Sequence, residues 1–356
     1  MAVLRAALVT SLTGPLARFG RATATALGIW AEAAAELPRP WTAVTLELHD
    51  AHPNPAAVMR AAVATSPHVL FGPYGSAASV AAVGATRRVV WNHGGATSKL
   101  AWPGFPHIVN VLSPASSYYS GILQLVREAD PAAVALSILH ASSGFPCDVA
   151  GGAAVSAGQL GFRVSTVTFA PGRAEDASAR LPDGEVLLVA GAFEEEVAAA
   201  RVLLRRRWRA AAFIGAGVQD VLAPLEDERE GLLGPAQWVP TVTVEPDEGP
   251  DASWFMAEFR DVTGRDPDYP AVQAFAAGVL CARCLRESLG VDDAKQFAAA
   301  KRLRCRTLYG DFRLDPTSGL QVGHEMLTVQ WQGGQRRVVW PPQYADARLV
   351  YPRTTY

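Results

Sequence analysis

Short runs of apolar residues alternate along the first part of the chain with longer stretches in which apolar residues recur every three or four positions. Residues 3–9 form an almost continuous apolar run, and residues 16–36 follow with helical spacing. The same order repeats through residues 44–49, 55–65 and 68–71. Parallel strands buried on both faces have such continuous runs and need a crossover helix between them. The pattern therefore predicts βαβ units in an α/β fold.

The alternation breaks at residues 103–114 and then restarts. Strands are expected at 88–91, 107–111, 133–139, 162–169, 185–189 and 211–214, and helices at 116–128, 147–160 and 194–207. The remaining helices are expected at 251–263, 271–289 and 293–302, and short strands at 310–314, 325–331 and 336–340. Gly333-Gly334 is a hairpin signal between the last two strands. We expect two doubly wound parallel-sheet lobes.

The composition is that of a globular protein with about two domains. The chain has 356 residues, of which 49% are hydrophobic and 19% charged, and its net charge is −2. This near-neutral charge gives no reason to expect nucleic acid or an anionic membrane as a partner. The sequence also has no stretch of about 18 apolar residues that would predict a membrane span.

The first residues do not have the pattern of a secretion signal, because Met1-Ala2 runs directly into the first predicted strand. Two locations are open at this point. Either the protein is cytoplasmic, or it is periplasmic or on the cell surface and its signal is absent from this sequence.

The four cysteines favour reduced, buried thiols. Cys281 and Cys284 form a CxxC, but they lie inside an apolar helical run without the second ligand pair of a zinc site. A disulfide from Cys305 to either of these cysteines is the alternative, since spacing alone cannot fix pairing.

Two consecutive strand exits contain the candidate chemistry. The run 68–71 ends in Gly72-Pro73-Tyr74-Gly75-Ser76, and the run 88–91 ends in Asn92-His93-Gly94-Gly95-Ala96-Thr97. Ligands of open parallel sheets bind outside the carboxyl ends of strands, where helix N-termini offer free N–H groups. We expect Ser76, Ala96 and Thr97 to cradle a carboxylate or a similar polar head. Ser76 and Thr97 could also be simple helix caps, and the two roles do not exclude each other.

Phe19 follows the first strand, so it is either an apolar wall of the same site or a core aromatic. Other motifs favour no chemistry. His49-Asp50-Ala51-His52 lies in a polar turn and has no distant partner for a metal site. Gly215-Ala216-Gly217 lacks the third glycine of a dinucleotide fingerprint, and Gly72 to Ser76 lacks the spacing of a nucleophile elbow. We predict no cofactor, no metal and no enzymatic activity.

Four segments resemble the branched-chain amino-acid-type, or leucine-binding, family of type I periplasmic solute-binding proteins. They are LTGPLARFG, DAHPNPAAVMRAA, the pair FGPYGSAASVAA and NHGGATSKL, and the C-terminal GDFRLDPTSGLQVGHEMLTVQWQGGQRRVVWP. Each motif is modest, but their order and spacing together cover nearly the whole chain.

The resemblance implies a clamshell of two lobes joined by three hinge strands, with ligand in the interlobe cleft. Lobe one would comprise 1–113 plus 241–310, and lobe two 114–240 plus 311–356. The ligand-binding positions implied by the family, or adjacent to them in the same loops, are Phe19, Tyr74, Ser76, Gly95, Ala96, Thr97 and Tyr269 in lobe one, and Phe145, Phe193 and Gly217 in lobe two.

Lobe two departs from the pattern of amino-acid binders. Gly217 stands where the family has an acidic residue for the ligand's ammonium, and Phe145 and Phe193 stand where it usually has tyrosines. Leaving a buried ammonium without a counter-charge costs several kcal/mol. We therefore predict a ligand with a carboxylate or amide head and an apolar or aromatic body, unless Asp220 substitutes as the acid.

Two functions are compatible with the resemblance. The first is the solute receptor of an ATP-driven (ABC) importer, with the membrane permease as partner. The second is a cytoplasmic amide or amino-acid sensor that regulates an operon and has the same fold. The C-terminal segment favours the receptor, and the missing signal favours the sensor.

Overall fold

The computed structural model describes residues 2–353, which divide into two compact units. Unit 1 comprises residues 2–114 and 238–325, and unit 2 comprises 115–237 and 326–353. The chain passes from one unit to the other three times. The expected boundary at residue 310 is wrong, because residues 311–325 belong to unit 1. There Gln321 donates to the carbonyl of Val111, and the carbonyl of Gly319 accepts from Asn110.

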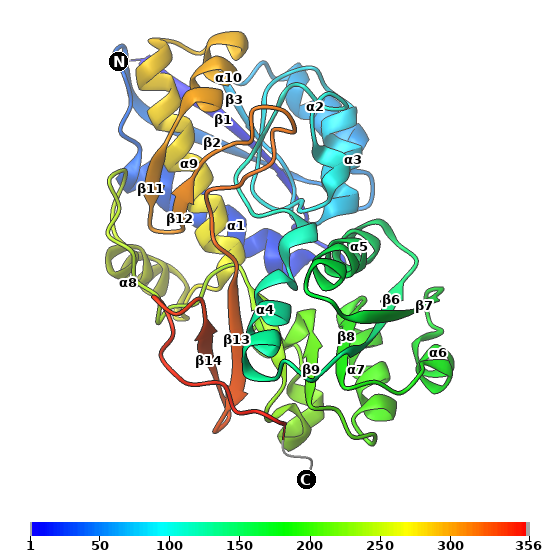
Figure 1. Cartoon of the computed structure of the whole chain (residues 1–356). Coiled ribbons are helices and arrows are strands. Elements are labelled where there is room, and N and C mark those ends of the chain that lie inside the picture. Colours follow the sequence, from blue (N-terminus) through cyan, green and yellow to red (C-terminus); the bar gives the residue numbers. More distant parts are fainter. Residues whose placement is uncertain (1, 354–356) are drawn as a thin grey trace. The chain divides into compact units, whose positions relative to one another are not determined.

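Unit 1 is built on a five-stranded sheet with the order β2-β1-β3-β4-β5, and all its pairs are parallel (Figure 1). The strands are β1 (Ala2–Thr10), β2 (Trp41–Asp50), β3 (Val69–Phe71), β4 (Val90–Asn92) and β5 (Ile108–Asn110). Along β1 the side chains alternate between two cores. Leu4, Ala6 and Leu8 belong to one, and Ala7 and Val9 to the other. Burial on both faces explains why the sequence of β1 is a continuous apolar run.

Helices cover both faces of this sheet. One core packs against α1 (Ala17–Ile29), α8 (Ala252–Thr263) and α9 (Tyr269–Ser288), and the other against α2 (Pro55–Ala64) and α3 (Ser76–Gly84). A π-helical turn, Trp30–Ala34, continues α1, and α10 (Asp293–Arg302) packs on α9. The hairpin of β11 (Cys305–Thr307) and β12 (Gly310–Phe312) completes the unit. Thr13 is not the cap of α1, since its hydroxyl bonds to Asp50 instead.

Unit 2 has a seven-stranded sheet with the order β14-β13-β10-β9-β8-β6-β7. Its strands are β6 (Ala135–Ala141), β7 (Arg163–Phe169), β8 (Val186–Ala190), β9 (Ala210–Phe213), β10 (Leu233–Ala236), β13 (Leu327–Gln332) and β14 (Gln335–Trp340). The strands from β7 to β10 are parallel, whereas β13 is antiparallel to β10 and β14. The predicted hairpin between β13 and β14 is confirmed, with positive φ at Gly333 and Gly334.

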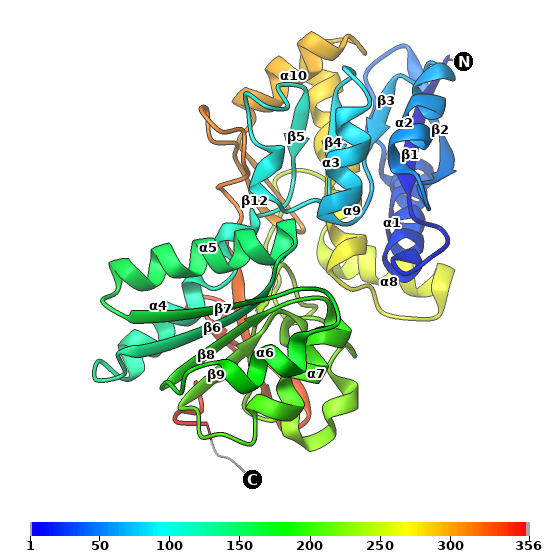
Figure 2. The ribbon, with the colours of Figure 1, turned by 90° about the vertical axis from the view of Figure 1, so that its right-hand side faces the viewer.

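Figure 2 shows α4 (Ser120–Ala129) and α5 (Gly144–Gln159) on one face of this sheet, and α6 (Ala174–Arg180) and α7 (Phe193–Leu203) on the other. The two-unit α/β prediction is thus confirmed, but α6 and β10 were not predicted. Helix α6 is short and mostly polar, and β10 has the sequence Leu-Gly-Pro-Ala, in which glycine and proline hide a strand.

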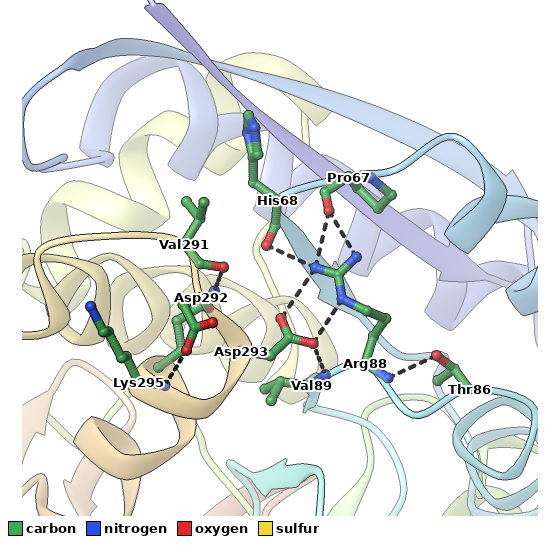
Figure 3. Close-up of polar contacts among 10 residues, drawn as sticks. Pro67, His68, Thr86, Arg88, Val89, Val291, Asp292, Asp293 and Lys295 are labelled. Atoms are coloured by element: carbon green, nitrogen blue, oxygen red, sulfur yellow. Dashed lines mark hydrogen bonds and ion pairs between the residues drawn. The ribbon is translucent and has the colours of Figure 1, made fainter.

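An ion pair ties α10 to the amino ends of the unit 1 strands (Figure 3). The Arg88 guanidinium donates to both carboxylate oxygens of Asp293, at 2.7 and 3.1 Å, and to the carbonyls of Pro67 and His68. Asp293 also accepts from the backbone N–H of Val89 at 2.9 Å. This cluster lies at the opposite end of the strands from the exits that carry the predicted ligand residues.

All four cysteines are free. Cys281 and Cys284 are buried as expected, whereas Cys305 is half-buried and Cys147 is exposed at the start of α5. Within residues 2–353, no helix is long and apolar enough to cross a membrane. The same part of the chain has no group of three or more His, Cys, Asp or Glu side chains arranged to hold a metal ion.

Candidate ligand-binding site

The strand order of unit 1 reverses between β1 and β3, and such a reversal creates a crevice at the carboxyl ends of the two strands. The chain leaves β1 at Thr10 and β3 at Phe71. Phe19 follows the first exit, and Tyr74 and Ser76 follow the second. The fold therefore brings residues predicted from two separate motifs to the place where open α/β sheets bind ligands.

Three of the predicted aromatic residues form one continuous row. Phe19 is in the first turn of α1 and stacks on Tyr74, with ring centroids 4.6 Å apart and planes inclined by 20°. The Tyr74 hydroxyl is hydrogen-bonded to that of Tyr269, the first residue of α9. Phe19 is buried, and both tyrosines are half-buried. This row, from three separate elements, gives unit 1 an aromatic surface with hydroxyl groups at one end.

Ser76 holds the two strand exits together. It is the first residue of α3, and its Oγ accepts from the backbone N–H groups of Ala96 and Thr97, both at 3.2 Å. The two N–H groups are therefore satisfied within the protein by the Ser76 hydroxyl. That Ser76, Ala96 and Thr97 together cradle a polar head stays a prediction. No side chain caps α3 in the described residues, so its first turn remains the source of N–H donors beside the Ser76 hydroxyl.

Thr97 has the capping role that the sequence left open. Its Oγ1 accepts from the backbone N–H of Lys99 at 3.3 Å, at the start of a 3₁₀ turn (Ser98–Leu100). Thr97 is also nearly fully buried, like Ala96 beside it. Both residues line the β4 exit with their backbone and small side chains.

Gly94 and Gly95 are required by close packing. A Cβ at Gly94 would lie 2.5 Å from the Cα of Tyr74, and a Cβ at Gly95 would lie 2.5 Å from the Cβ of Ser79. Any side chain at these positions would push the β4 exit away from the β3 exit. The glycines therefore set the distance between the two loops.

Two buried asparagines support the β4 exit, and the sequence analysis missed both. Asn92 Nδ2 donates to the carbonyl of Gly95 at 2.7 Å and to Asn110 Oδ1 at 2.8 Å, while its Oδ1 accepts from the N–H of Gly95 at 2.8 Å. Asn110 in turn donates to the carbonyls of Leu100 and Gly319. Fully satisfied buried networks of this kind make a local structure rigid.

The His49-to-His52 turn is structural. Asp50 accepts from the N–H groups of Leu12, Thr13 and His52 and from the Thr13 hydroxyl at 2.6 Å. The hydroxyl bond is the largest cause that lowers the Asp50 pKa to about 2. Asp50 thereby fixes the loop that follows β1 and leads to Phe19.

His93 directly follows β4 and is fully buried. Neither ring nitrogen has a hydrogen-bond partner in the described part of the chain. Burial lowers the His93 pKa to about 4, although the nearby carbonyls of Gly72 and of His93 itself act in the opposite direction. The ring is therefore neutral at physiological pH.

Unit 2 repeats the topology of unit 1, since its parallel strands have the order β7-β6-β8-β9-β10 and reverse between β6 and β8. The predicted residues Phe145 and Phe193 follow these two strands, in the first turn of α5 and as the first residue of α7. Both side chains are half-buried. The predicted residues of unit 2 therefore also lie at a switch point.

Phe145 has a hydroxyl-bearing neighbour that the sequence analysis missed. The Tyr118 ring packs edge-on against it, with centroids 5.4 Å apart and an interplanar angle of 78°. The Tyr118 hydroxyl accepts from Gln237 Nε2 at 3.0 Å, and burial raises its pKa to about 12. Although position 145 is not a tyrosine, the phenol of Tyr118 therefore lies next to it.

Gly217 has no room for a side chain. A Cβ there would lie 1.7 Å from the carbonyl oxygen of Pro235 in β10, and the Gly217 carbonyl accepts from Arg336 at 2.7 Å. An acidic side chain at this position would displace β10. Asp220, the predicted substitute, is exposed and accepts a hydrogen bond from Gln219.

The buried acid of this region is Glu196, in the first turns of α7. Its side chain is completely buried, and its carboxyl oxygens accept from the backbone N–H groups of Gly191, Ile214 and Gly215, at 3.2, 3.3 and 2.7 Å. Burial raises the Glu196 pKa to about 8, against these donors, which lower it. In the sequence, Glu196 belongs to the triplet Glu194-Glu195-Glu196, which follows a predicted strand. From periodicity alone, such a triplet is expected at the solvated start of a helix.

Residues 3–335 match a family profile described as periplasmic binding protein. The chain belongs to this family. The family resemblance seen in the sequence is thereby confirmed, and so is the two-lobed α/β fold class.

Solved structures with the same fold include transport proteins of known ligand. A leucine-binding protein, LivK, from Thermotoga maritima is 15% identical, with a TM-score of 0.80 over 94% of this chain and 97% of that chain. A solute-binding protein from R. palustris in complex with benzoate is 14% identical, with a TM-score of 0.76 and coverage of 95% and 96%. Another from R. palustris, in complex with 4-hydroxybenzoate, is 15% identical, with a TM-score of 0.77 and 95% coverage of both chains. At these identities the likeness concerns the fold.

Proposed function

We propose that this periplasmic binding protein is the solute receptor of an ABC importer. Its ligand would be a small molecule with a carboxylate or amide head and an apolar or aromatic body. The observation that carries the proposal is the pairing, in unit 1, of an aromatic row with a polar strand exit. Tyr74 and Tyr269 are half-buried and offer aromatic surface, which the buried Phe19 ring supports from behind Tyr74. Ser76 offers a hydroxyl at the uncapped start of α3.

The chemistry of these groups suits an anionic head. A helix N-terminus and a hydroxyl donate hydrogen bonds to a carboxylate, and hydrogen bonds to charged groups are the stronger kind. An aromatic body would stack or pack edge-on against the row. Gly217 cannot carry an acid, which argues against a free ammonium on the ligand. The benzoate and 4-hydroxybenzoate complexes of proteins with this fold support an aromatic carboxylate as the first candidate.

By the same proposal, Gly95, Ala96, Thr97, Phe145 and Phe193 contribute to ligand binding together with the residues of the aromatic row. The membrane permease is the protein partner, and the location is periplasmic or at the cell surface. Fractionation of the source cells distinguishes this receptor from the alternative function, because a cytoplasmic sensor would be found in the cytoplasmic fraction.

Isothermal titration of the whole chain against benzoate, 4-hydroxybenzoate, benzamide, leucine and valine tests the ligand class. We expect micromolar binding of at least one aromatic carboxylate or amide and weaker binding of both amino acids. Micromolar binding of leucine without binding of any aromatic compound would contradict the predicted ligand. Binding of no compound in the panel would contradict the proposed function as stated.

A further inference from the structure

We propose that Glu196 is a positioning residue that fixes the two ligand-facing loops of unit 2 to each other. The inference rests on the proposed function only for the statement that these loops face a ligand. The first loop joins β8 to α7 and leads to Phe193, and the second follows β9 and leads to Gly217. Glu196 is bonded to both.

The geometry assigns this role to one side chain. Oε1 accepts from Gly191 at 3.2 Å and from Ile214 at 3.3 Å, and Oε2 accepts from Gly215 at 2.7 Å. The three donors come from two chain segments that are separated by one helix, α7, and one strand, β9. A single carboxyl group therefore connects the exits of two neighbouring strands, in a fully buried place where an unsatisfied N–H is costly.

The surroundings leave little room for any other arrangement. A Cβ at Gly215 would lie 3.0 Å from Glu196 Oε2, and one at Gly217 would overlap the carbonyl of Pro235. Tyr119 is also fully buried, and its hydroxyl donates to the carbonyl of Val189, the residue before the end of β8. The β8 exit is thus held on two sides. The β9 exit receives side-chain hydrogen bonds from Glu196, from Trp331 on the Ala216 carbonyl at 2.9 Å, and from Arg336 on the Gly217 carbonyl. Among these, Glu196 is the one that also bonds to the β8 exit.

The neighbouring glutamates provide matched controls. Glu195 accepts from the N–H groups of Ala192 and Gly172, so it serves the start of α7 and not the β9 exit. Glu194 is exposed in the same helical turn. Glu194→Gln therefore makes the same Glu-to-Gln change in the same turn without touching either loop.

The first test needs no ligand. Hydrogen–deuterium exchange is measured on the wild-type chain, Glu196→Gln and Glu194→Gln, well below their unfolding temperatures. We expect exchange at Gly191, Ile214 and Gly215 to accelerate about tenfold or more in Glu196→Gln alone, because hydrogen bonds to a carboxyl group are lost. Unchanged exchange there, or an equal acceleration across β6 and β7, would overturn the proposal, since the latter indicates only a loss of global stability.

The second test uses benzoate as the probe. If wild type binds it, we expect the Kd to rise about tenfold in Glu196→Gln and to change less than about twofold in Glu194→Gln. The effects of Glu196→Gln and Phe193→Ala on the Kd should be less than additive, because Glu196 acts by positioning the loop that leads to Phe193. Full additivity, or an unchanged Kd in Glu196→Gln, would overturn the proposal.

Glu196→Asp covers the case in which Glu196→Gln does not fold. The shorter side chain keeps the carboxyl group but cannot reach both exits, so the same local exchange should accelerate. Wild-type exchange in this variant would overturn the proposal. If wild type binds neither benzoate nor any other compound of the panel, the proposed function fails. The exchange experiment still decides the role of Glu196.

Discussion

Phe19 and Tyr74 stack nearly in parallel, with ring centroids 4.6 Å apart. The two residues are 55 positions apart in the sequence, and β2, α2 and β3 lie between them. Aromatic pairs in such geometry contribute about 0.5–1.5 kcal/mol beyond the burial of their surface. The stack joins the exits of β1 and β3, so it contributes to the shape of the candidate site as well as to stability.

Phe19→Leu tests the stack as a ligand-binding surface. The substitution keeps most of the apolar volume but loses the stack, so it should cost about 1–2 kcal/mol of unfolding free energy. We expect benzoate affinity to fall by roughly 3- to 10-fold, since the Tyr74 ring loses the aromatic partner that holds it in place. Titration calorimetry and thermal unfolding measure the two effects. Phe297→Leu is the control, because Phe297 pairs with Trp102 elsewhere in unit 1, and an equal loss of affinity in both variants would contradict a specific role for Phe19.

Ser76→Ala removes the acceptor shared by Ala96 and Thr97. Because two buried N–H groups lose their partner and the ligand loses a donor, benzoate binding should weaken by about 1.5–3 kcal/mol. Titration calorimetry measures this loss. Ser253→Ala, at a helix start on the surface, should leave the Kd unchanged. Wild-type affinity in Ser76→Ala would rule out the strand exits as the binding site of the polar head.

His93 predicts a dependence of stability on acid. Its pKa is about 4 in the folded chain, below the ordinary value of 6.5, because burial disfavours the charged ring. The unfolded chain therefore binds the proton first, and stability that is present above pH 6.5 is lost as the pH falls towards 4. The loss from this group alone amounts to about 3 kcal/mol.

Denaturant unfolding of wild type and His93→Gln between pH 7.5 and pH 4 (about the range in which an ordinary histidine and this one titrate) measures the contribution as a difference. The two curves should converge as the pH falls, since the variant lacks the titrating ring. Curves that run parallel throughout would show that His93 is not responsible.

The Arg88–Asp293 pair should stabilise unit 1 more than an ordinary surface pair (Figure 3). The two side chains are only 31% and 27% exposed, and Asp293 also holds the Val89 N–H. We expect Asp293→Ala to cost about 1–3 kcal/mol in denaturant unfolding. Asp266→Ala breaks the Arg260–Asp266 pair, which is 56% and 62% exposed, and should cost about 0.5 kcal/mol or less. Equal effects of the two substitutions would contradict a special role for the α10 contact.

Gly217→Ala and Gly151→Ala should have opposite effects. A Cβ at Gly217 would overlap Pro235, so β10 must move and we expect a loss of about 2 kcal/mol or more. Gly151 lies in the middle of α5 with nothing within 4 Å of its Cβ position, and alanine there should stabilise by about 0.5–1 kcal/mol. Thermal unfolding of both variants measures this. A neutral Gly217→Ala would mean that this position can accept a side chain, including the acid of amino-acid binders.

The sequence predicted those parts of the fold in which local pattern and tertiary environment agree. The run of β1 is apolar because it is buried on both faces, and Gly333-Gly334 adopts the positive φ values that its turn requires. The sequence-based prediction was wrong where tertiary contacts determine to which unit a segment belongs. Residues 311–325 join unit 1 through Gly319 and Gln321, which no periodicity reveals.

The same division applies to the candidate site. Glycine and hydroxyl residues after a predicted strand can be recognised in the sequence, so the position of Tyr74, Ser76 and Gly95 at strand exits was predictable. Glu196, Asn92 and Tyr118 were missed, because their importance comes from burial and from partners distant in sequence. The sequence of the triplet does not show that Glu194 is exposed, that Glu195 is half-buried and that Glu196 is fully buried.

The threefold passage of the chain between the units has a consequence for the order of folding. Neither unit is a continuous stretch, since the sheet of unit 1 precedes residue 114 while its long helix α9 follows residue 238. The sheet of unit 2 likewise waits for β13 and β14, which follow residue 326. A ribosome that has made two thirds of the chain therefore has neither core complete. Exposed apolar strand and helix faces persist until synthesis is nearly finished, and transiently exposed apolar surface of this kind makes a chain prone to aggregation.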